Sequence, residues 1–134
     1  MIKKLNLSLC LFFAALLLSS CDPYSGQRPV DYGDAEWISE TPEIYFAVDT
    51  AMDEYYYPLG RIMVDDTEYL CKFWFVHQTN QLIISVYMDE KATPETCVGE
   101  IKGDCDFFSD HFIMYIDSDT VFDGQYNSIV FYKN

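Results

Sequence analysis

The chain has 134 residues, half of them apolar, and carries 22 acidic against 8 basic side chains, a formal net charge of −14 at pH 7. One domain of this size buries a core without a metal or a disulfide ladder, so global disorder is not expected. The negative charge repels a phosphate backbone and argues against nucleic acid as a partner. We interpret the acidity as a means of keeping an exposed protein soluble, with attraction of a cationic peptide or of divalent ions as the alternative.

The first 20 residues have the organisation of a secretory signal peptide. Two lysines follow the first two residues, and positions 5–18 form an apolar run broken only by Asn6 and Ser8. As a helix this run spans about 21 Å, which is too short for a hydrocarbon core of about 30 Å and favours a cleaved signal. No later segment is apolar enough to cross a membrane, so we expect the rest of the chain to be exported.

The apolar run ends in the motif Leu18-Ser19-Ser20-Cys21. It resembles the lipobox of bacterial lipoproteins, in which an aliphatic residue and small residues precede an invariant cysteine. The resemblance covers residues 1–21 and implies cleavage before Cys21 and a lipid on its thiol, with palmitate-like acyl chains that bind firmly to a bilayer. The expected location is the cell envelope, at the outer face of the cytoplasmic membrane or at the outer membrane.

Residues 21–36 are predicted to be the lipidated cysteine and a flexible acidic tether. After Cys21 the segment contains two prolines, two glycines and four acids, and it shows no hydrophobic periodicity. Such a composition leaves little to bury and is typical of a linker. In anchor, tether and size the protein resembles the many small, functionally uncharacterised lipoproteins that bacteria display on their envelopes.

From residue 37 to residue 134 the pattern changes to short apolar stretches separated by turns, which predicts β-strands. Val, Ile, Tyr and Phe dominate these stretches and suit a pleated, half-buried surface. The predicted strands are residues 43–49, 60–64, 68–77, 81–88, 96–101, 111–117 and 126–133. Polar breaks at 65–67, 78–80 and 123–125 predict turns. We therefore expect an all-β domain, a single antiparallel meander that closes either as a small barrel or as a two-sheet sandwich.

Three cysteines remain once Cys10 leaves with the signal and Cys21 is lipidated. An odd number outside the cytosol allows at most one internal disulfide. Cys97 and Cys105 enclose a short segment with two glycines and are predicted to pair if that segment folds as a hairpin. Cys71 alternates with aromatic residues on one strand face and is expected to be a buried free thiol.

Other candidate sites for chemistry are weak. A zinc site made of cysteines with His77 or His111 lacks any closely spaced ligand pair. The segment containing Asp117, Asp119 and Asp123 begins like a calcium loop but departs from the EF-hand pattern at its fifth, sixth and twelfth positions. No phosphate loop, nucleophile elbow or zinc-protease motif is present. We expect no metal, no cofactor and no catalytic residues.

Nineteen aromatic residues lie between Trp37 and Tyr132, and two clusters place rings on successive strand positions. Each face of the sheet therefore receives some rings. We favour the interpretation that both faces are covered and that all rings are packing residues. The alternative is an exposed aromatic platform for a sugar or an apolar peptide.

These features together favour a non-catalytic binding or interaction module that is presented to an extracytoplasmic protein, peptide or glycan. One alternative is a structural envelope protein that self-associates through a sheet edge. Another is a small hydrolase. An exposed apolar patch would favour the first, an unpaired edge strand the second, and a deep pocket lined by acids or histidines the third.

Overall fold

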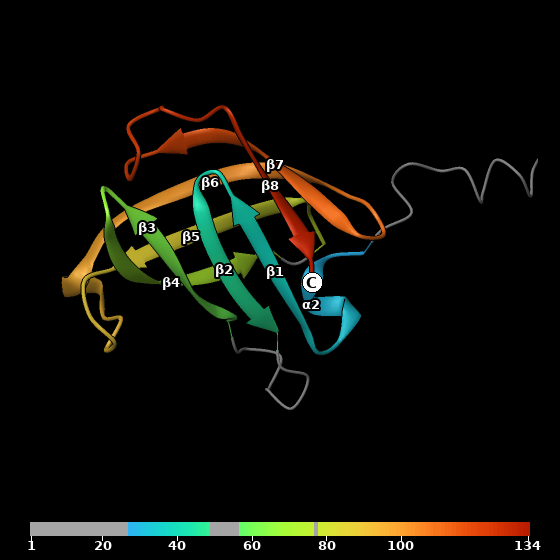
Figure 1. Cartoon of the computed structure of the whole chain (residues 1–134), viewed down its shortest axis with the longest axis horizontal. Coiled ribbons are helices and arrows are strands. Elements are labelled where there is room, and N and C mark those ends of the chain that lie inside the picture. The colour runs from blue at the N-terminus through green and yellow to red at the C-terminus, as the bar shows by residue number, and fades with distance from the viewer. Residues whose placement is uncertain (1–26, 49–56, 77) are drawn as a thin grey trace, which may run out of the picture.

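The computed structural model describes residues 27–48, 57–76 and 78–134, so the predicted signal peptide and Cys21 lie outside the described residues. Eight antiparallel strands form one closed barrel, in which each strand pairs with its neighbours along the chain (Figure 1). They are β1 (Ala35–Glu40), β2 (Glu43–Val48), β3 (Leu59–Val64), β4 (Thr67–Phe75), β5 (Gln81–Tyr87), β6 (Cys97–Phe107), β7 (His111–Asp119) and β8 (Ser128–Lys133). The predicted all-β meander is confirmed, and it is a barrel rather than a sandwich.

Closure of the sheet depends on a short seam between its first and last strands. Trp37 of β1 lies opposite Lys133 of β8, and Ile38 lies opposite Tyr132. Beyond these pairs, the backbone amide of Asn134 donates to the carbonyl of a β1 residue at 2.8 Å. Because this seam closes the sheet into a barrel, one face of every strand points to the interior.

Alternation along each strand decides which side chains enter the barrel. In β4 the side chains of Cys71, Phe73 and Phe75 are buried, whereas Trp74 between them is exposed. In β5 every second residue is buried in the same way. Because successive side chains of a strand point to opposite faces, closure gathers the inward set into a single core.

Aromatic rings fill that core. The ring centroid of Phe46 lies 4.1 Å from that of Phe73 and 5.7 Å from that of Phe131. Phe112 stacks on Phe131 at 4.7 Å and lies 5.5 Å from Trp37. All five side chains are almost completely buried. Ring pairs at these separations contribute about 0.5–1.5 kcal/mol each beyond the burial of their area.

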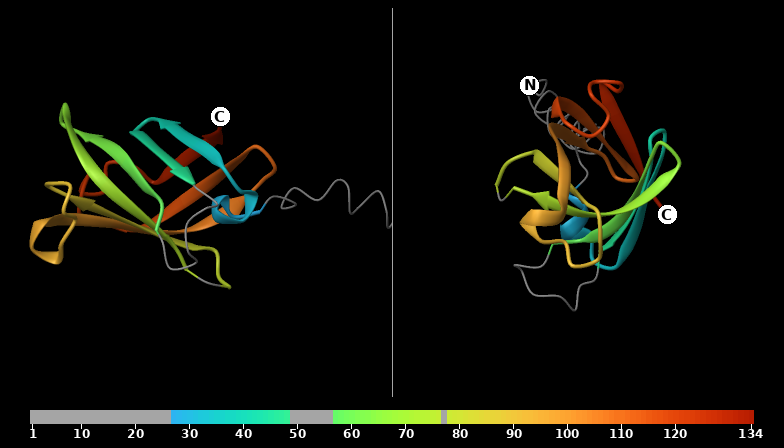
Figure 2. Two further views of the ribbon diagram at one scale, coloured as in Figure 1. Left: turned by 90° about the horizontal axis from the view of Figure 1, so that it is seen from below. Right: turned by 90° about the vertical axis from the view of Figure 1, so that its left-hand side faces the viewer.

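One end of the barrel is covered by the helix α2 (Pro29–Tyr32), and we call it the capped end (Figure 2). Pro29 is buried, and Val30 and Tyr32 pack against the core. The Tyr32 ring lies 5.7 Å from that of Trp37. Antiparallel order brings the end of β4, the start of β5, the β6–β7 turn and the end of β8 to this same end.

The second half of the predicted tether is therefore part of the folded domain, and that prediction is wrong for residues 28–36. The Arg28 guanidinium donates to the carbonyl of Val76 at 3.3 Å, and the Tyr32 hydroxyl lies 3.2 Å from the carbonyl of Phe108. The prediction failed because a single turn of helix shows no periodicity in sequence. Only residues 22–26 remain between Cys21 and the first described residue, Gln27.

The three predicted turns are confirmed. Asp65 and Asp66 both have positive φ, 51° and 67°, and join β3 to β4. Gln78, at φ 59°, lies between β4 and β5, and Gly124, at φ 79°, lies between β7 and β8. Asp and Gly tolerate this left-handed region better than most residues, which is why they mark the first and the third of these turns.

Phe46 and its neighbour Tyr45 offer a matched test of the packing, because they lie side by side on β2 and point to opposite faces. We expect Phe46→Ala to lower the free energy of unfolding by about 3–5 kcal/mol, since it leaves a cavity among packed rings. Tyr45 is 37% exposed, so Tyr45→Ala should lower the free energy of unfolding by only about 1 kcal/mol or less. Urea denaturation followed by circular dichroism measures both, and equal losses would contradict the assignment of inner and outer faces.

Candidate functional site

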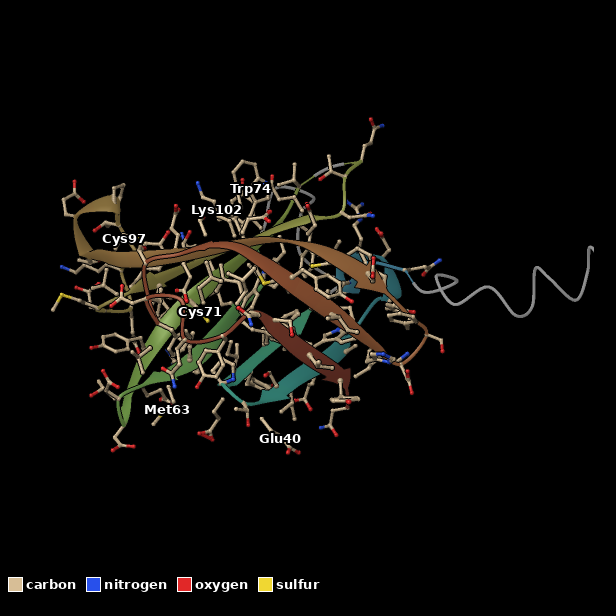
Figure 3. The ribbon with its side chains drawn as sticks, turned by 90° about the horizontal axis from the view of Figure 1, so that it is seen from above. Glu40, Met63, Cys71, Trp74, Cys97 and Lys102 are labelled. Atoms are coloured by element: carbon tan, nitrogen blue, oxygen red, sulfur yellow. The ribbon has the colours of Figure 1, made fainter. Side chains whose placement is uncertain are left out.

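The outer face of β3 and β4 carries exposed apolar side chains. Tyr57, Leu59 and Trp74 are 42%, 38% and 47% exposed, and the rings of Tyr57 and Trp74 lie 6.1 Å apart. Figure 3 shows Trp74 on the outside of the barrel. Trp74 points outward because Phe73 and Phe75 on either side of it enter the core. The expectation that all aromatic residues are packing residues is thus wrong for this face, since no second layer covers the outside of the barrel within the described chain.

A hollow of about 290 Å³ opens on this face, and we call it the outer groove. Outward side chains of β3 and β4 and the connection that follows β5 line it. The lining residues are Tyr57, Leu59, Leu70, Lys72, Glu90, Lys91 and Ala92. The volume is close to the lower limit of small-molecule sites, about 300 Å³, so the groove fits a small ligand or one or two side chains of a larger one.

The groove carries excess positive charge although the protein is strongly acidic. Its one carboxylate among the described lining residues, Glu90, lies 3.9 Å from the guanidinium of Arg61. The ammonium of Lys72 lies 5.5 Å from the ring centroid of Tyr87. Neither Lys72 nor Lys91 forms an ion pair with any described residue. Two such ammonium groups beside leucine side chains complement a ligand that joins an apolar part to a negative charge.

In the acidic segment at the end of β7, the central carboxylate, that of Asp119, accepts hydrogen bonds from the backbone of the same segment. Oδ1 of Asp119 accepts hydrogen bonds from the amides of Val121 and Phe122, each at 2.8 Å. Asp117 and Asp123 are exposed on either side of it. The described ranges hold no group of three or more side chains placed to bind a metal.

His111 pairs with its neighbour at the capped end, whereas His77 lies outside the described residues. The Nδ1 of His111 lies 2.7 Å from Oδ1 of Asp110, and its ring stacks on Phe108 with centroids 4.5 Å apart. The hydrogen bond from His111 lowers the pKa of the exposed Asp110 carboxyl. No described nucleophile or second carboxylate accompanies the pair in a pocket, so the arrangement does not form a catalytic constellation.

The predicted disulfide between Cys97 and Cys105 is wrong. Both residues lie on the single strand β6, eight positions apart, which separates them by about 26 Å in extended backbone. A disulfide needs Cα atoms within about 7 Å. Gly99 and Gly103, interpreted as turn residues, instead lie within the strand. All three described cysteines are free, and Cys71 is the buried thiol that was predicted.

No protein-family model, curated protein sequence or solved structure matches this chain. Over the described ranges, no helix has the length and apolar character needed to cross a membrane. The outer groove was not predicted from the sequence, because its lining comes from two strands and a distant connection that only the fold brings together. The exposed Trp74 between two buried phenylalanines is the one signal in sequence that pointed to this face.

The reactivity of the cysteines tests how the residues of β6 are placed in the barrel. Burial raises the pKa of the Cys71 and Cys105 thiols, so both should stay protonated and unreactive in the folded protein. Cys97 is partly exposed and should react with iodoacetamide at pH 8. Among the three described cysteines, mass spectrometry is expected to find one alkylated in buffer and all three alkylated in guanidinium. Rapid labelling of Cys105, or a crosslinked peptide containing Cys97 and Cys105, would contradict the placement of β6.

Proposed function

We propose that the protein is a non-catalytic binding module, held on a membrane surface by a lipid on Cys21, which binds a ligand through the outer groove. The ligand combines an apolar part with a negative charge. The observation that carries this proposal is the juxtaposition of Leu59 and Leu70 with the ammonium groups of Lys72 and Lys91, neither of which forms an ion pair within the described part of the chain. The charge contrast with the rest of the protein gives the site its selectivity.

A packed interior directs binding to the outside of the barrel. Trp37, Phe46, Phe73, Phe112 and Phe131 are between 0% and 1% exposed and contact one another across the lumen. Small barrels either fill the interior with side chains or hold one small ligand there. Here aromatic side chains of the described residues occupy that space, and the outer groove lies on the outside of the barrel.

The same geometry favours binding over the two alternatives. A hydrolase needs convergent acid–base groups in a cleft, and the described groove lining offers a single carboxylate that faces Arg61. Self-association through a sheet edge needs an unpaired strand, whereas β1 pairs with both β2 and β8. The size of the groove favours a small amphiphile, or a short acidic and apolar stretch of an extracytoplasmic peptide or protein, over a glycan.

Binding of decanoate, with decanol as a neutral partner of equal chain length, tests the proposal. We expect isothermal titration calorimetry to show binding of decanoate and at least tenfold weaker binding of decanol, since only the carboxylate pairs with the lysines. The double variant Lys72→Glu/Lys91→Glu should weaken decanoate binding by about tenfold or more, which corresponds to about 1.4 kcal/mol.

Lys102→Glu is the matched control for that experiment. Lys102 lies on the outer face of β6, within 3.7 Å of Glu100 and outside the groove lining. Lys102→Glu also replaces a positive charge by a negative one. The altered electrostatic field of the protein alone should decrease the decanoate affinity by less than about twofold. An equal loss in Lys102→Glu and in the double variant, or no binding of decanoate by the unaltered protein, would refute the groove as the site.

The anchor is tested separately. Cys21→Ala removes the thiol of the lipobox and should abolish both labelling by a palmitate analogue and fractionation with membranes. The decanoate affinity of the purified variant should be unchanged, because Cys21 is not among the residues that line the groove. Equal labelling of the variant and the unaltered protein would refute the lipid attachment.

A further inference from the structure

The lipid anchor in the proposed function lies very close to the folded domain. The backbone amide of Gln27 donates to the hydroxyl of Tyr32 at 3.1 Å, so the chain is held against α2 from residue 27 onward. Six residue steps separate Cys21 from Gln27, and they reach about 22 Å at most. This inference rests on lipidation of Cys21, as the proposed function does. Given that anchor, the end of the barrel from which the chain leaves must stay near the bilayer.

That end is the capped end. The chain leaves the barrel beside α2, and Arg28 next to it binds the carbonyl of Val76 directly after β4 (Figure 2). Trp74, the penultimate residue of β4, is two positions from that carbonyl, and Tyr57 lies in ring contact with Trp74. The exposed rings are therefore close to where the short tether begins.

Exposed aromatic side chains occur on two sides of the capped end. Tyr57 and Trp74 lie at β3 and β4, and Tyr132, 56% exposed, is the penultimate residue of β8. We call these three residues the aromatic rim. Tyr45 and Tyr115, 37% and 47% exposed, lie within β2 and β7, away from the capped end. At the opposite end the exposed large apolar residues of the described chain are Met88 and Val98. Trp and Tyr are the side chains that favour the boundary between lipid and water.

The basic side chains described at the capped end each have a partner. Arg28 pairs with Asp31 at 3.0 Å, and His111 pairs with Asp110 at 2.7 Å. The ammonium of Lys133 lies 4.3 Å from the ring centroid of Tyr32. Such a surface offers no basic cluster for anionic head groups, so a zwitterionic interface suits it best.

We propose that the capped end docks on the membrane that holds the Cys21 lipid, with the aromatic rim of Tyr57, Trp74 and Tyr132 in the head-group region of zwitterionic phospholipid. The outer groove starts at Tyr57 on this rim and extends along the barrel to residues 90–92. Docking therefore places one end of the groove at the lipid surface and its lysines farther away.

The two tryptophans of the chain make this docking measurable, because Trp37 is 0% exposed and Trp74 is 47% exposed. The full lipidated protein is reconstituted in phosphatidylcholine vesicles, with and without bromine atoms on the acyl chains near the head group. Bromine quenches only nearby indoles, so the Trp74 emission should decrease if Trp74 lies in the head-group region, which Trp side chains favour. Trp74→Phe, which retains only Trp37, should show no loss.

A matched variant moves the reporter to the other end of the barrel. Trp74→Phe/Met88→Trp keeps one exposed tryptophan but places it at a position that is 68% exposed in the unaltered protein and remote from the tether. It should not be quenched. Quenching equal to that of Trp74, or an unquenched Trp74 in protein that floats with the vesicles, would overturn the docking alone. Failure to float would overturn the anchor and the docking together, while decanoate binding in detergent reports on the groove independently.

Discussion

Trp37 and Ile38 of β1 meet Lys133 and Tyr132 of β8 across only two residue pairs, and this seam decides what is inside and outside for every other strand. An open sheet of the same strands would expose one apolar face and two unpaired edges. Closure instead converts the apolar face into a core and pairs the two terminal strands with each other along this seam. Trp37 takes part in both the closure and the core, because its backbone lies on the seam and its ring packs against those of Phe46 and Phe112.

Filling the barrel with rings has a consequence for function. The indole N–H of Trp37 is the single fully buried side-chain polar atom of the described chain without a hydrogen-bond partner, which costs about 1–3 kcal/mol. Dense aromatic packing offsets that cost but leaves the lumen occupied by the protein itself. Recognition therefore depends on the outer surface, where Leu70, Lys72 and Trp74 alternate with core residues on the same strand. One strand thus stabilises the barrel with one face and contributes to the groove with the other.

The sequence predicted the fold wherever alternation was clear and failed where polar residues hid it. β1 was not predicted because only Trp37 and Ser39 of its six residues are buried, and acids surround them. The second half of β6 was interpreted as a turn because its inward positions include Gly103 and Cys105, which carry little hydrophobic signal. The groove was beyond prediction, since its residues come from positions 57–72 and 90–92 and meet only after closure.

The central claim is that ligand binds outside a filled barrel, and methyl NMR spectroscopy during a decanoate titration tests it most directly. The methyl groups of Leu59, Leu70 and Ala92 line the groove, whereas those of Ile44, Ile84 and Ile129 lie in the core and are between 0% and 1% exposed. The account predicts saturable shifts of the first set and unchanged positions of the second. Saturable shifts confined to the core isoleucines would show that the ligand enters the barrel and would contradict the account.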